Sequence, residues 1–207
     1  TYVLSCMGSV VENQLIGSAP NAQYYLFITE DVNEENPVEE SYWVEAAELA
    51  DYYGADIINT SLGYFGYDNP SYSYTYNDMN GTTSFISRGL NIAHSRGMIV
   101  VVSAGNSGTT ANPNIGTPAD ALKAFTIGAV DSNENYVSFS SIGPTFDGRV
   151  KPDVVAKGLA ATLSDTNGSI ITASGTSFSS PIIAGMVASF WSAVPNLTND
   201  QVIQFIK

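Results

Sequence analysis

The fold is decided by the stretch Met98-Ile99-Val100-Val101-Val102-Ser103-Ala104-Gly105-Asn106-Ser107-Gly108. A β-branched apolar run of this length is typical of a strand buried in a parallel sheet. Functional groups in open α/β sheets lie just past the carboxyl ends of such strands. The side-chain amide of Asn106 is therefore a candidate donor to a developing oxyanion, although its glycine neighbours equally suit an asparagine that serves only in a turn.

Strand-like and helix-like patterns alternate outward from this stretch. Helices are expected at 2–11, 39–53 and about 83–96, and strands at 24–28, 56–61, 98–103 and 125–130. The β-α-β-α-β order predicts an α/β fold, with a doubly wound, mostly parallel sheet that carries helices on both faces. A single domain over residues 1–207 is expected.

The C-terminal part of the chain is less regular. Residues 136–174 are rich in Gly, Ser and Asp and are expected to form antiparallel or irregular pieces. An apolar helix is expected at 182–194. Thr198, followed three residues later by Gln201, predicts a capped final helix.

A second candidate site lies in the motif Gly175-Thr176-Ser177-Phe178-Ser179-Ser180-Pro181, which opens the apolar helix. A helix N-terminus presents free N–H groups and the positive end of the helix dipole to a negative charge. That environment suits a serine nucleophile whose attack creates an oxyanion. Pro181 is expected in the first turn, where its missing N–H needs no helical partner. Taken alone, the motif also fits the Ser/Thr-rich cap of a buried helix.

Several motifs occur together in a fixed order: GSAPNAQ, DIINTSLG, SAGNSG, FTIGAVDSNENYVSFSSIGP, KPDVVAKG and GTSFSSP. In that order they resemble the subtilisin-like serine peptidases (subtilases) over nearly the whole chain. The resemblance implies a subtilisin-like fold and a serine endopeptidase with Ser177 as nucleophile. It also implies that the Asn106 amide and the Ser177 backbone N–H form the oxyanion hole. Peptides or proteins would be the substrates, no cofactor would be required, and the location would be extracytoplasmic or secreted.

The resemblance is incomplete at the N-terminus. Subtilases carry Asp, His and Ser in that order, and Thr1-Tyr2-Val3 resembles the continuation of their His-Gly-Thr-x-Val motif. We therefore expect the C-terminal portion of a catalytic domain, with the missing segment that carries Asp and His as its partner. The chain alone should be inactive, because a serine hydroxyl is a weak nucleophile until a base removes its proton. His94 falls in the last turn of an expected helix, which in the family packs away from the active-site face.

Two other functions stay open. A catalytically dead peptide-binding module would be compatible with the absent His and Asp, although the intact motifs around Ser177 and Asn106 argue against it. An α/β-hydrolase would need Gly-x-Ser-x-Gly and a later His. Here Ser179 stands where the second Gly should be, and no His follows Ser177.

The resemblance also implies substrate-binding residues. The family segment that matches Ser61, Leu62 and Gly63 pairs with the peptide backbone, which is strand addition to a sheet edge. The specificity pocket matches Ser103, Ala104, Gly105 and Gly116, whose small size leaves room for a large side chain. No charge occurs at these positions, nor at Ser107 on the expected rim. A large apolar or aromatic residue is therefore expected before the scissile bond.

Residues 64–76 contain six aromatic residues and look like an insertion relative to short subtilases. Their rings either extend the peptide-binding wall or pack on one another in a compact loop. Asp78-Met79-Asn80-Gly81 faintly resembles the start of a calcium loop but lacks the later ligands. The stretch 12–17 is shorter than the calcium loop of the family. Structural calcium therefore stays an open expectation, and no metal ligand is assigned.

The charge of the chain is distributed unevenly. There are 20 Asp and Glu against 7 Lys and Arg, and no Lys or Arg precedes Arg88. Nine acids fall between Glu30 and Asp51, and they are expected to form a solvated loop and helix face. Docking of a basic upstream segment and a bias toward cationic substrates are the alternatives. An acidic surface disfavours nucleic acid and anionic membranes as partners.

Two further expectations concern packing and association. The single Cys6 excludes an internal disulfide, and its small apolar neighbours predict a buried structural thiol. No apolar run is long enough for a membrane span. If an N-terminal strand is missing, a sheet edge is exposed, which invites self-association or pairing with another chain.

Overall fold

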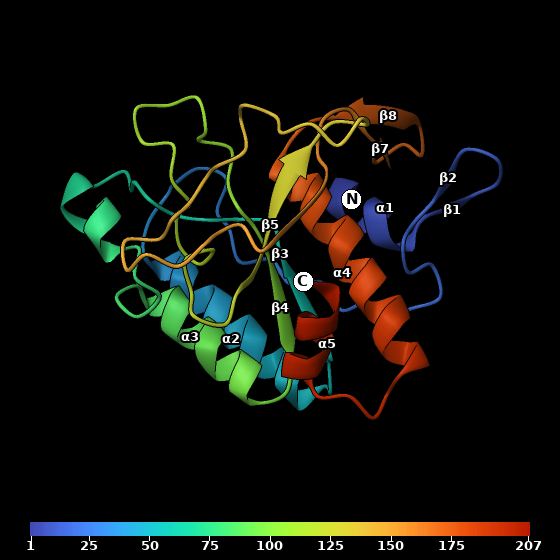
Figure 1. Ribbon diagram of the computed structural model, residues 1–207, viewed down its shortest axis with the longest axis horizontal. Helices are drawn as coiled ribbons and strands as arrows, with labels where there is room; N and C mark the ends of the chain where they lie inside the picture. Colours follow the sequence, from blue (N-terminus) through green and yellow to red (C-terminus); the bar gives the residue numbers. More distant parts are fainter.

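The computed structural model describes residues 1–207, which fold around a four-stranded sheet (Figure 1). Its strands are β3 (Ile57–Thr60), β4 (Ile99–Ser103), β5 (Phe125–Val130) and β6 (Val154–Lys157), in the order β3-β4-β5-β6. All three pairings are parallel. Every residue of β4 and β5 is buried, as expected for β-branched runs with helices on both sides.

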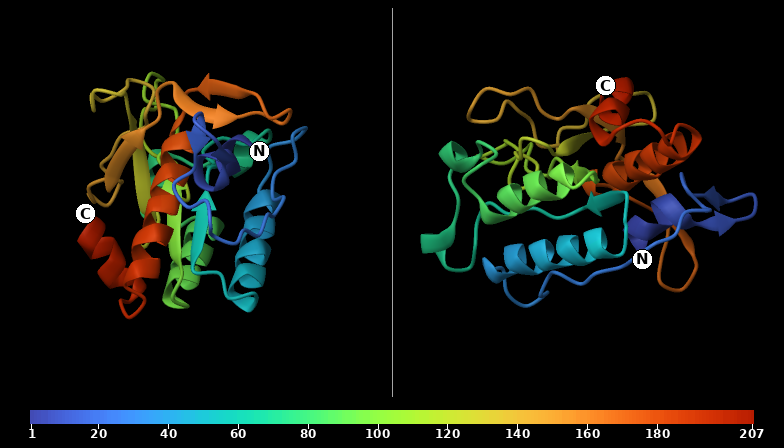
Figure 2. Two further views of the ribbon diagram at one scale, coloured as in Figure 1. Left: turned by 90° about the vertical axis from the view of Figure 1, so that its right-hand side faces the viewer. Right: turned by 90° about the horizontal axis from the view of Figure 1, so that it is seen from below.

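Helices cover both faces of the sheet (Figure 2). One face carries α2 (Val38–Tyr52) and α3 (Phe85–Ser95), and the other carries α4 (Thr176–Ala193) and α5 (Asn199–Ile206). Val100 and Val102 of β4 join the core beneath α2 and α3, whereas Ile99 and Val101 join the core beneath α4 and α5. Because side chains alternate along a strand, one strand thus serves two cores. The predicted α/β fold is confirmed.

Shorter elements complete the chain. The first helix, α1 (Tyr2–Gly8), is shorter than the predicted 2–11, because the chain turns into the β1–β2 hairpin (Val10–Val11 and Leu15–Ile16). Two 3-10 turns, η1 (Pro70–Tyr72) and η2 (Tyr76–Asp78), lie in the tyrosine-rich stretch. An antiparallel pair, β7 (Ala161–Ser164) and β8 (Ile170–Ala173), lies in the region expected to hold such pieces.

The final helix, α5, begins as its sequence predicts. The Thr198 hydroxyl accepts a hydrogen bond from the Gln201 backbone, and the Gln201 side chain accepts one from the Thr198 backbone. Together they satisfy two N–H groups that would otherwise be free at the helix start. None of the helices is both long enough and apolar enough to cross a membrane.

The strand predicted at 24–28 is not formed. Residues 23–31 have no regular secondary structure, and Leu26 and Ile28 are 73% and 96% exposed. A strand needs a neighbour for its backbone N–H and C=O groups. The sheet ends at β3, and no strand is paired with the outer edge of β3. The apolar pattern of 24–28 was therefore misleading because its pairing partner is not among the strands present.

The acidic stretch is only partly solvated, contrary to the prediction. Glu39 and Glu40, in the first turn of α2, are each 1% exposed. Glu40 accepts hydrogen bonds from the hydroxyls of Tyr67 and Tyr74, both at 2.6 Å, and from the backbone N–H of Ile86 at 2.7 Å. The bond to Ile86 satisfies a free N–H group in the first turn of α3. Glu40 is thus a structural link between two helices and the tyrosine-rich loop.

The tyrosine-rich stretch packs largely on itself. The rings of Tyr64 and Tyr67 stack with centroids 5.7 Å apart, and Tyr74 lies 6.0 Å from Tyr67. Burial, together with the hydrogen bonds to Glu40, raises the pKa of Tyr67 and Tyr74, so both hydroxyls stay protonated donors. Of the two alternatives for residues 64–76, the compact loop whose rings pack on one another describes these three tyrosines. Phe65 and Tyr64 also reach a cavity beside Ser177.

The single thiol has a structural setting. Cys6 is buried within α1, and burial raises the pKa of its thiol to about 11. A thiol that stays protonated is a poor nucleophile. The predicted buried, unreactive cysteine agrees with this environment.

Candidate active site

Ser177 is the second residue of α4, which starts at Thr176. The first turn of a helix has backbone N–H groups without helical partners, and the Ser177 N–H is one of them. Figure 1 shows α4 beginning beside the carboxyl end of β5. The serine therefore lies at the edge of the sheet where parallel α/β folds collect their functional groups.

The prediction for Pro181 was wrong in one respect. The proline lies inside α4, five residues after its start, and not in the first turn. Its missing N–H would have bonded the carbonyl oxygen of Ser177, four residues earlier. The hydroxyl of Ser61 donates to that oxygen instead, at 3.1 Å. The proline thus frees the carbonyl of Ser177 for a contact with the segment that follows β3.

A short polar network holds this contact. The Asn59 side chain donates to the Ser61 hydroxyl at 3.1 Å and accepts from the Ser180 hydroxyl at 2.8 Å. These bonds connect the end of β3 to the first turns of α4. They limit the movement of Ser177 relative to the expected peptide-binding segment.

Asn106 follows β4 after a turn at Gly105, whose φ is +101°. A side chain at Gly105 would be strained by that φ and would meet the Ser141 hydroxyl at 2.9 Å. The Asn106 side-chain oxygen accepts from the backbone N–H of Thr176 at 2.9 Å and from its hydroxyl at 3.0 Å. Its Nδ2 makes no hydrogen bond within the chain. Because the two hydrogen bonds from Thr176 fix the side-chain oxygen, they also fix the orientation of the Nδ2 donor. An asparagine that serves only in a turn would bond to its own loop instead.

One cavity of about 360 Å³ collects every residue that the sequence assigned to catalysis or substrate binding. The proposed oxyanion donor and the nucleophile lie in its wall, together with the predicted peptide-binding segment and specificity-pocket residues. These nine residues are Ser61, Leu62, Gly63, Ser103, Ala104, Gly105, Asn106, Gly116 and Ser177. No Asp, Glu, Lys, Arg or His lines the cavity, so it is a neutral site without a general base of its own.

Six lining residues were missed by the sequence analysis: Thr110, Asn112, Asn114, Thr117, Ala119 and Ser141. The stretch 109–114 was not assigned a role, although its Thr and Asn residues lie between two assigned motifs. Ser141 belongs to the loop that follows β5 and folds back to the cavity. No local sequence pattern predicts that contact. Gly116 is required by space, since a Cβ there would lie 2.7 Å from the Tyr64 carbonyl oxygen.

His94 lies at the opposite end of the sheet from Ser177. It is near the end of α3, and its Nε2 lies 3.0 Å from an Asp200 side-chain oxygen. The Asn199 side chain bridges the carbonyls of His94 and Met98, just before β4 begins. The five residues of β4 separate that end from Asn106, about 16 Å at the usual rise. Burial lowers the pKa of His94 despite Asp200, and the residue is structural as predicted.

The faint calcium motif at 78–81 is occupied by local hydrogen bonds. Asp78 accepts from the backbone N–H and hydroxyl of Thr75. Asn80 accepts from the backbone and hydroxyl groups of Thr82 and Thr83. These oxygens serve turns and a 3-10 cap, which leaves few free ligands for an ion.

Comparison with known proteins agrees with this geometry. Residues 5–207 match the model of the Subtilase family. The chain is 33% identical over 189 residues to subtilisin DY of Bacillus licheniformis, covering 91% of this chain and 61% of that protein. It is 36% identical over 141 residues to the serine protease AprX of Bacillus subtilis (strain 168), covering 58% of this chain and 32% of that protein.

Solved structures show the same fold. Sphericase, at 26% identity, superposes with a TM-score of 0.74 over 99% of this chain and 66% of its own. The self-cleaved protease domain of PatA, at 22% identity, gives a TM-score of 0.78 over 99% of this chain and 72% of its own. The chain spans about three-fifths of the length of subtilisin DY. With a family match over almost all of its residues and these shared motifs, the chain belongs to the subtilase family of serine peptidases.

Proposed function

We propose that this chain is the nucleophile-bearing part of a serine endopeptidase. The observation that carries the proposal is that Ser177 and the fixed Asn106 amide share one neutral cavity. The Ser177 Oγ attacks the carbonyl carbon of the scissile bond while a base takes its proton. The Asn106 Nδ2 and the Ser177 N–H donate to the resulting oxyanion. Collapse expels the amine and leaves an acyl-enzyme, which water then hydrolyses.

The general base comes from outside these residues under this proposal, because no titratable side chain lines the cavity. We propose an upstream segment of the same domain, carrying the family's Asp and His, as its source. A groove of about 920 Å³ is available to such a segment. It is lined by the extended residues 24–27, by β3 with its unpaired edge, and by apolar side chains of α2 and α4. A strand inserted there would pair with β3 and bury Tyr25 and Leu26.

Labelling by a fluorophosphonate tests this function. The chain should be labelled at Ser177 only when mixed with the upstream segment, since the probe requires an activated serine. Ser177→Ala should abolish labelling, whereas Ser95→Ala, which alters an exposed serine at the end of α3, should not. No labelling in a soluble, verified complex would contradict the peptidase and favour the alternative, a catalytically dead peptide-binding module. Self-association of the chain through β3, without segment binding, would contradict the proposed assembly.

Substrate selection follows from the neutral cavity. A charged side chain placed among Ser103, Ala104, Gly105 and Gly116 would lose water without gaining an opposite charge. We expect the assembled enzyme to cleave after Phe, Tyr, Leu or Met at least about 10-fold better than after Lys or Arg. Profiling with a mixed peptide library measures this preference, and a strong preference for Lys or Arg would contradict it. An extracytoplasmic location is part of the same proposal, by analogy with the family.

A further inference from the structure

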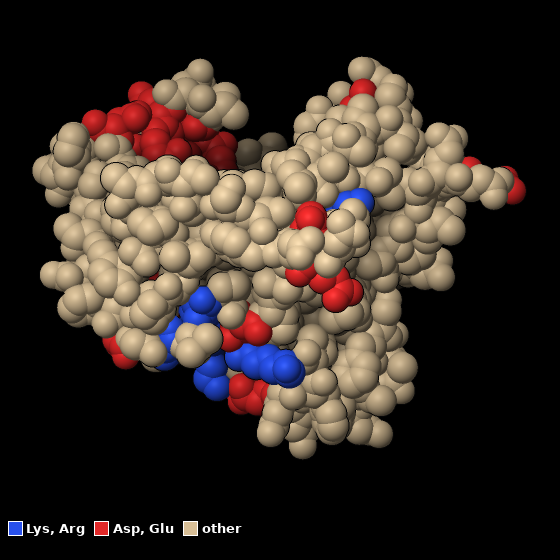
Figure 3. All heavy atoms as spheres, turned by 45° about the horizontal axis from the view of Figure 1, so that its top comes forward, with Lys and Arg blue, Asp and Glu red and all other residues tan.

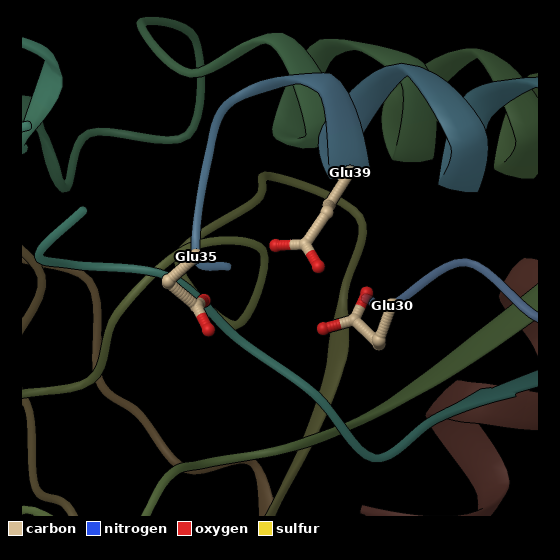
Figure 4. Close-up of side chains that lie close together, drawn as sticks. All are labelled: Glu30, Glu35 and Glu39. Atoms are coloured by element: carbon tan, nitrogen blue, oxygen red, sulfur yellow. The ribbon is translucent and has the colours of Figure 1, made fainter. Parts of the chain in front are cut away.

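Three glutamates converge at the N-terminal end of α2 (Figure 4). Glu30 ends the extended segment, Glu35 lies in the loop before α2, and Glu39 is in the first turn of α2. One carboxyl oxygen of each lies within 4.8 Å of those of the other two. Figure 3 shows that acidic atoms gather densely in one part of the surface, apart from the main group of basic side chains.

Glu39 supplies an independent sign that this cluster has a missing partner. The residue is 1% exposed, and its Oε1 accepts from the backbone N–H of Asp31 at 2.7 Å. Its Oε2 is buried and has no hydrogen-bond partner. Buried acceptors in native proteins are almost always paired, so an unpaired oxygen calls for an ion or molecule that the protein chain does not provide.

No basic side chain neutralises the cluster. None of its three glutamates takes part in an ion pair. The three carboxyl groups lie close enough together that their negative charges repel one another in the absence of a cation.

We propose that Glu30, Glu35 and Glu39 bind one Ca²⁺ ion. The donor set contains only carboxyl oxygens, which hard divalent cations prefer, and lacks the His and Cys ligands typical of zinc. At the usual Ca–O distances one ion spans oxygens up to about 4.6–5.2 Å apart, and the three carboxyl oxygens lie within 4.8 Å of one another. Mg²⁺ demands near-ideal octahedral geometry and usually keeps several waters, so three carboxylates from separate segments suit Ca²⁺ better. Glu35 is exposed, so water can complete the six to eight ligands that Ca²⁺ takes.

Such an ion would join three parts of the structure. It would bind the end of the extended segment, the loop 31–37 and the first turn of α2. It would also act on the cavity wall, because Glu30 accepts a hydrogen bond of 2.6 Å from the hydroxyl of Tyr64, and Tyr64 lines the cavity beside Ser177. The ion is structural, and its binding does not depend on the proposed peptidase activity.

The test uses the full chain, first freed of metal with a chelator, and CaCl₂ alone as the probe. Calorimetric titration should give one saturable site, and added Ca²⁺ should raise the melting temperature. Glu39→Gln should weaken binding by at least about 100-fold, because it removes the buried charged ligand. The metal-free melting temperature of Glu39→Gln should be equal to or higher than that of the parent, since the substitution also relieves repulsion. Glu48→Gln, an exposed change on the same helix, should leave Ca²⁺ binding unchanged.

Several outcomes would overturn the site. One is the absence of saturable binding up to about 10 mM, beyond the weakest extracellular calcium modules. Another is binding that Glu39→Gln and Glu30→Gln leave intact, which would place the ion elsewhere. Preferential binding of an arginine-containing peptide, with no response to Ca²⁺, would identify the cluster as a subsite for cationic side chains instead. Equal affinity for Mg²⁺ would contradict the assignment of the site to Ca²⁺.

Discussion

Replacing Asn106 by alanine is expected to lower kcat of the assembled peptidase by about 10²–10³-fold, the range known for the oxyanion-hole asparagine of subtilisin itself. The orientation of the Asn106 Nδ2 is fixed, because Thr176 donates two hydrogen bonds to the Oδ1 of the same amide. Because negative charge on the carbonyl oxygen develops only in the transition state, KM should change little. Steady-state kinetics on a neutral peptide substrate, in the complex with the upstream segment, measures both constants.

A second variant separates chemistry from folding. Asn106→Asp keeps an oxygen for the Thr176 bonds but replaces the donor by an acceptor, so it should lose at least as much kcat. Asn112→Ala removes a different amide from the wall of the same cavity and should retain most of the activity. Equal losses for Asn106→Ala and Asn112→Ala would show that the oxyanion role is wrong.

Replacing Glu40 by alanine is expected to lower the free energy of unfolding by about 3 kcal/mol or more. The substitution leaves two tyrosine hydroxyls and the Ile86 N–H without their acceptor, and each unsatisfied buried group costs about 1–3 kcal/mol. It also opens a cavity between α2, α3 and the tyrosine-rich loop. Urea unfolding of the chain, followed by circular dichroism, gives the change in midpoint.

Glu48→Ala is the matched control for this prediction. It makes the same chemical change on the same helix, but the side chain of Glu48 is exposed and makes no hydrogen bond. Its effect should stay within about 0.5 kcal/mol. Similar losses for both variants would mean that Glu40 contributes only as a helix residue. Glu40→Gln should fall between them, because the amide keeps one acceptor oxygen and turns the other into a donor.

The local parts of this fold could be predicted because their causes are local. The run from Ile99 to Ser103 is β-branched and apolar, so it predicts a strand buried on both faces wherever its neighbours lie. The box of Thr198 and Gln201 predicts a helix start within one turn of chain. The strand before Asn106 predicted a functional group at the carboxyl edge of the sheet, and the resemblance to the subtilases joined the motifs around Asn106 and Ser177 into one expected site.

Other features could not be predicted because they depend on contacts between distant parts of the chain. Residues 24–28 have the composition of a strand, but a strand exists only where another strand pairs with it. Glu39 and Glu40 look like members of a solvated acidic face, yet both are buried. Glu40 is buried because Tyr67 and Tyr74, from a loop about thirty residues later in the chain, pack against it and donate hydrogen bonds to its carboxylate.

The sequence by itself therefore determined the family and the parallel sheet, and it supplied the candidates that we propose as nucleophile and oxyanion donor. Only the tertiary structure decided how the Asn106 amide and the Ser177 segment are oriented. Thr176, seventy residues away, orients the Asn106 amide, and Ser61 bonds the carbonyl that Pro181 leaves free. Tertiary structure also brought three glutamates together, one of which, Glu39, has a buried oxygen without a hydrogen-bond partner. The reason is physical: propensity and periodicity act over a few residues, whereas burial, pairing and electrostatic environment are set by whatever the folded chain places alongside.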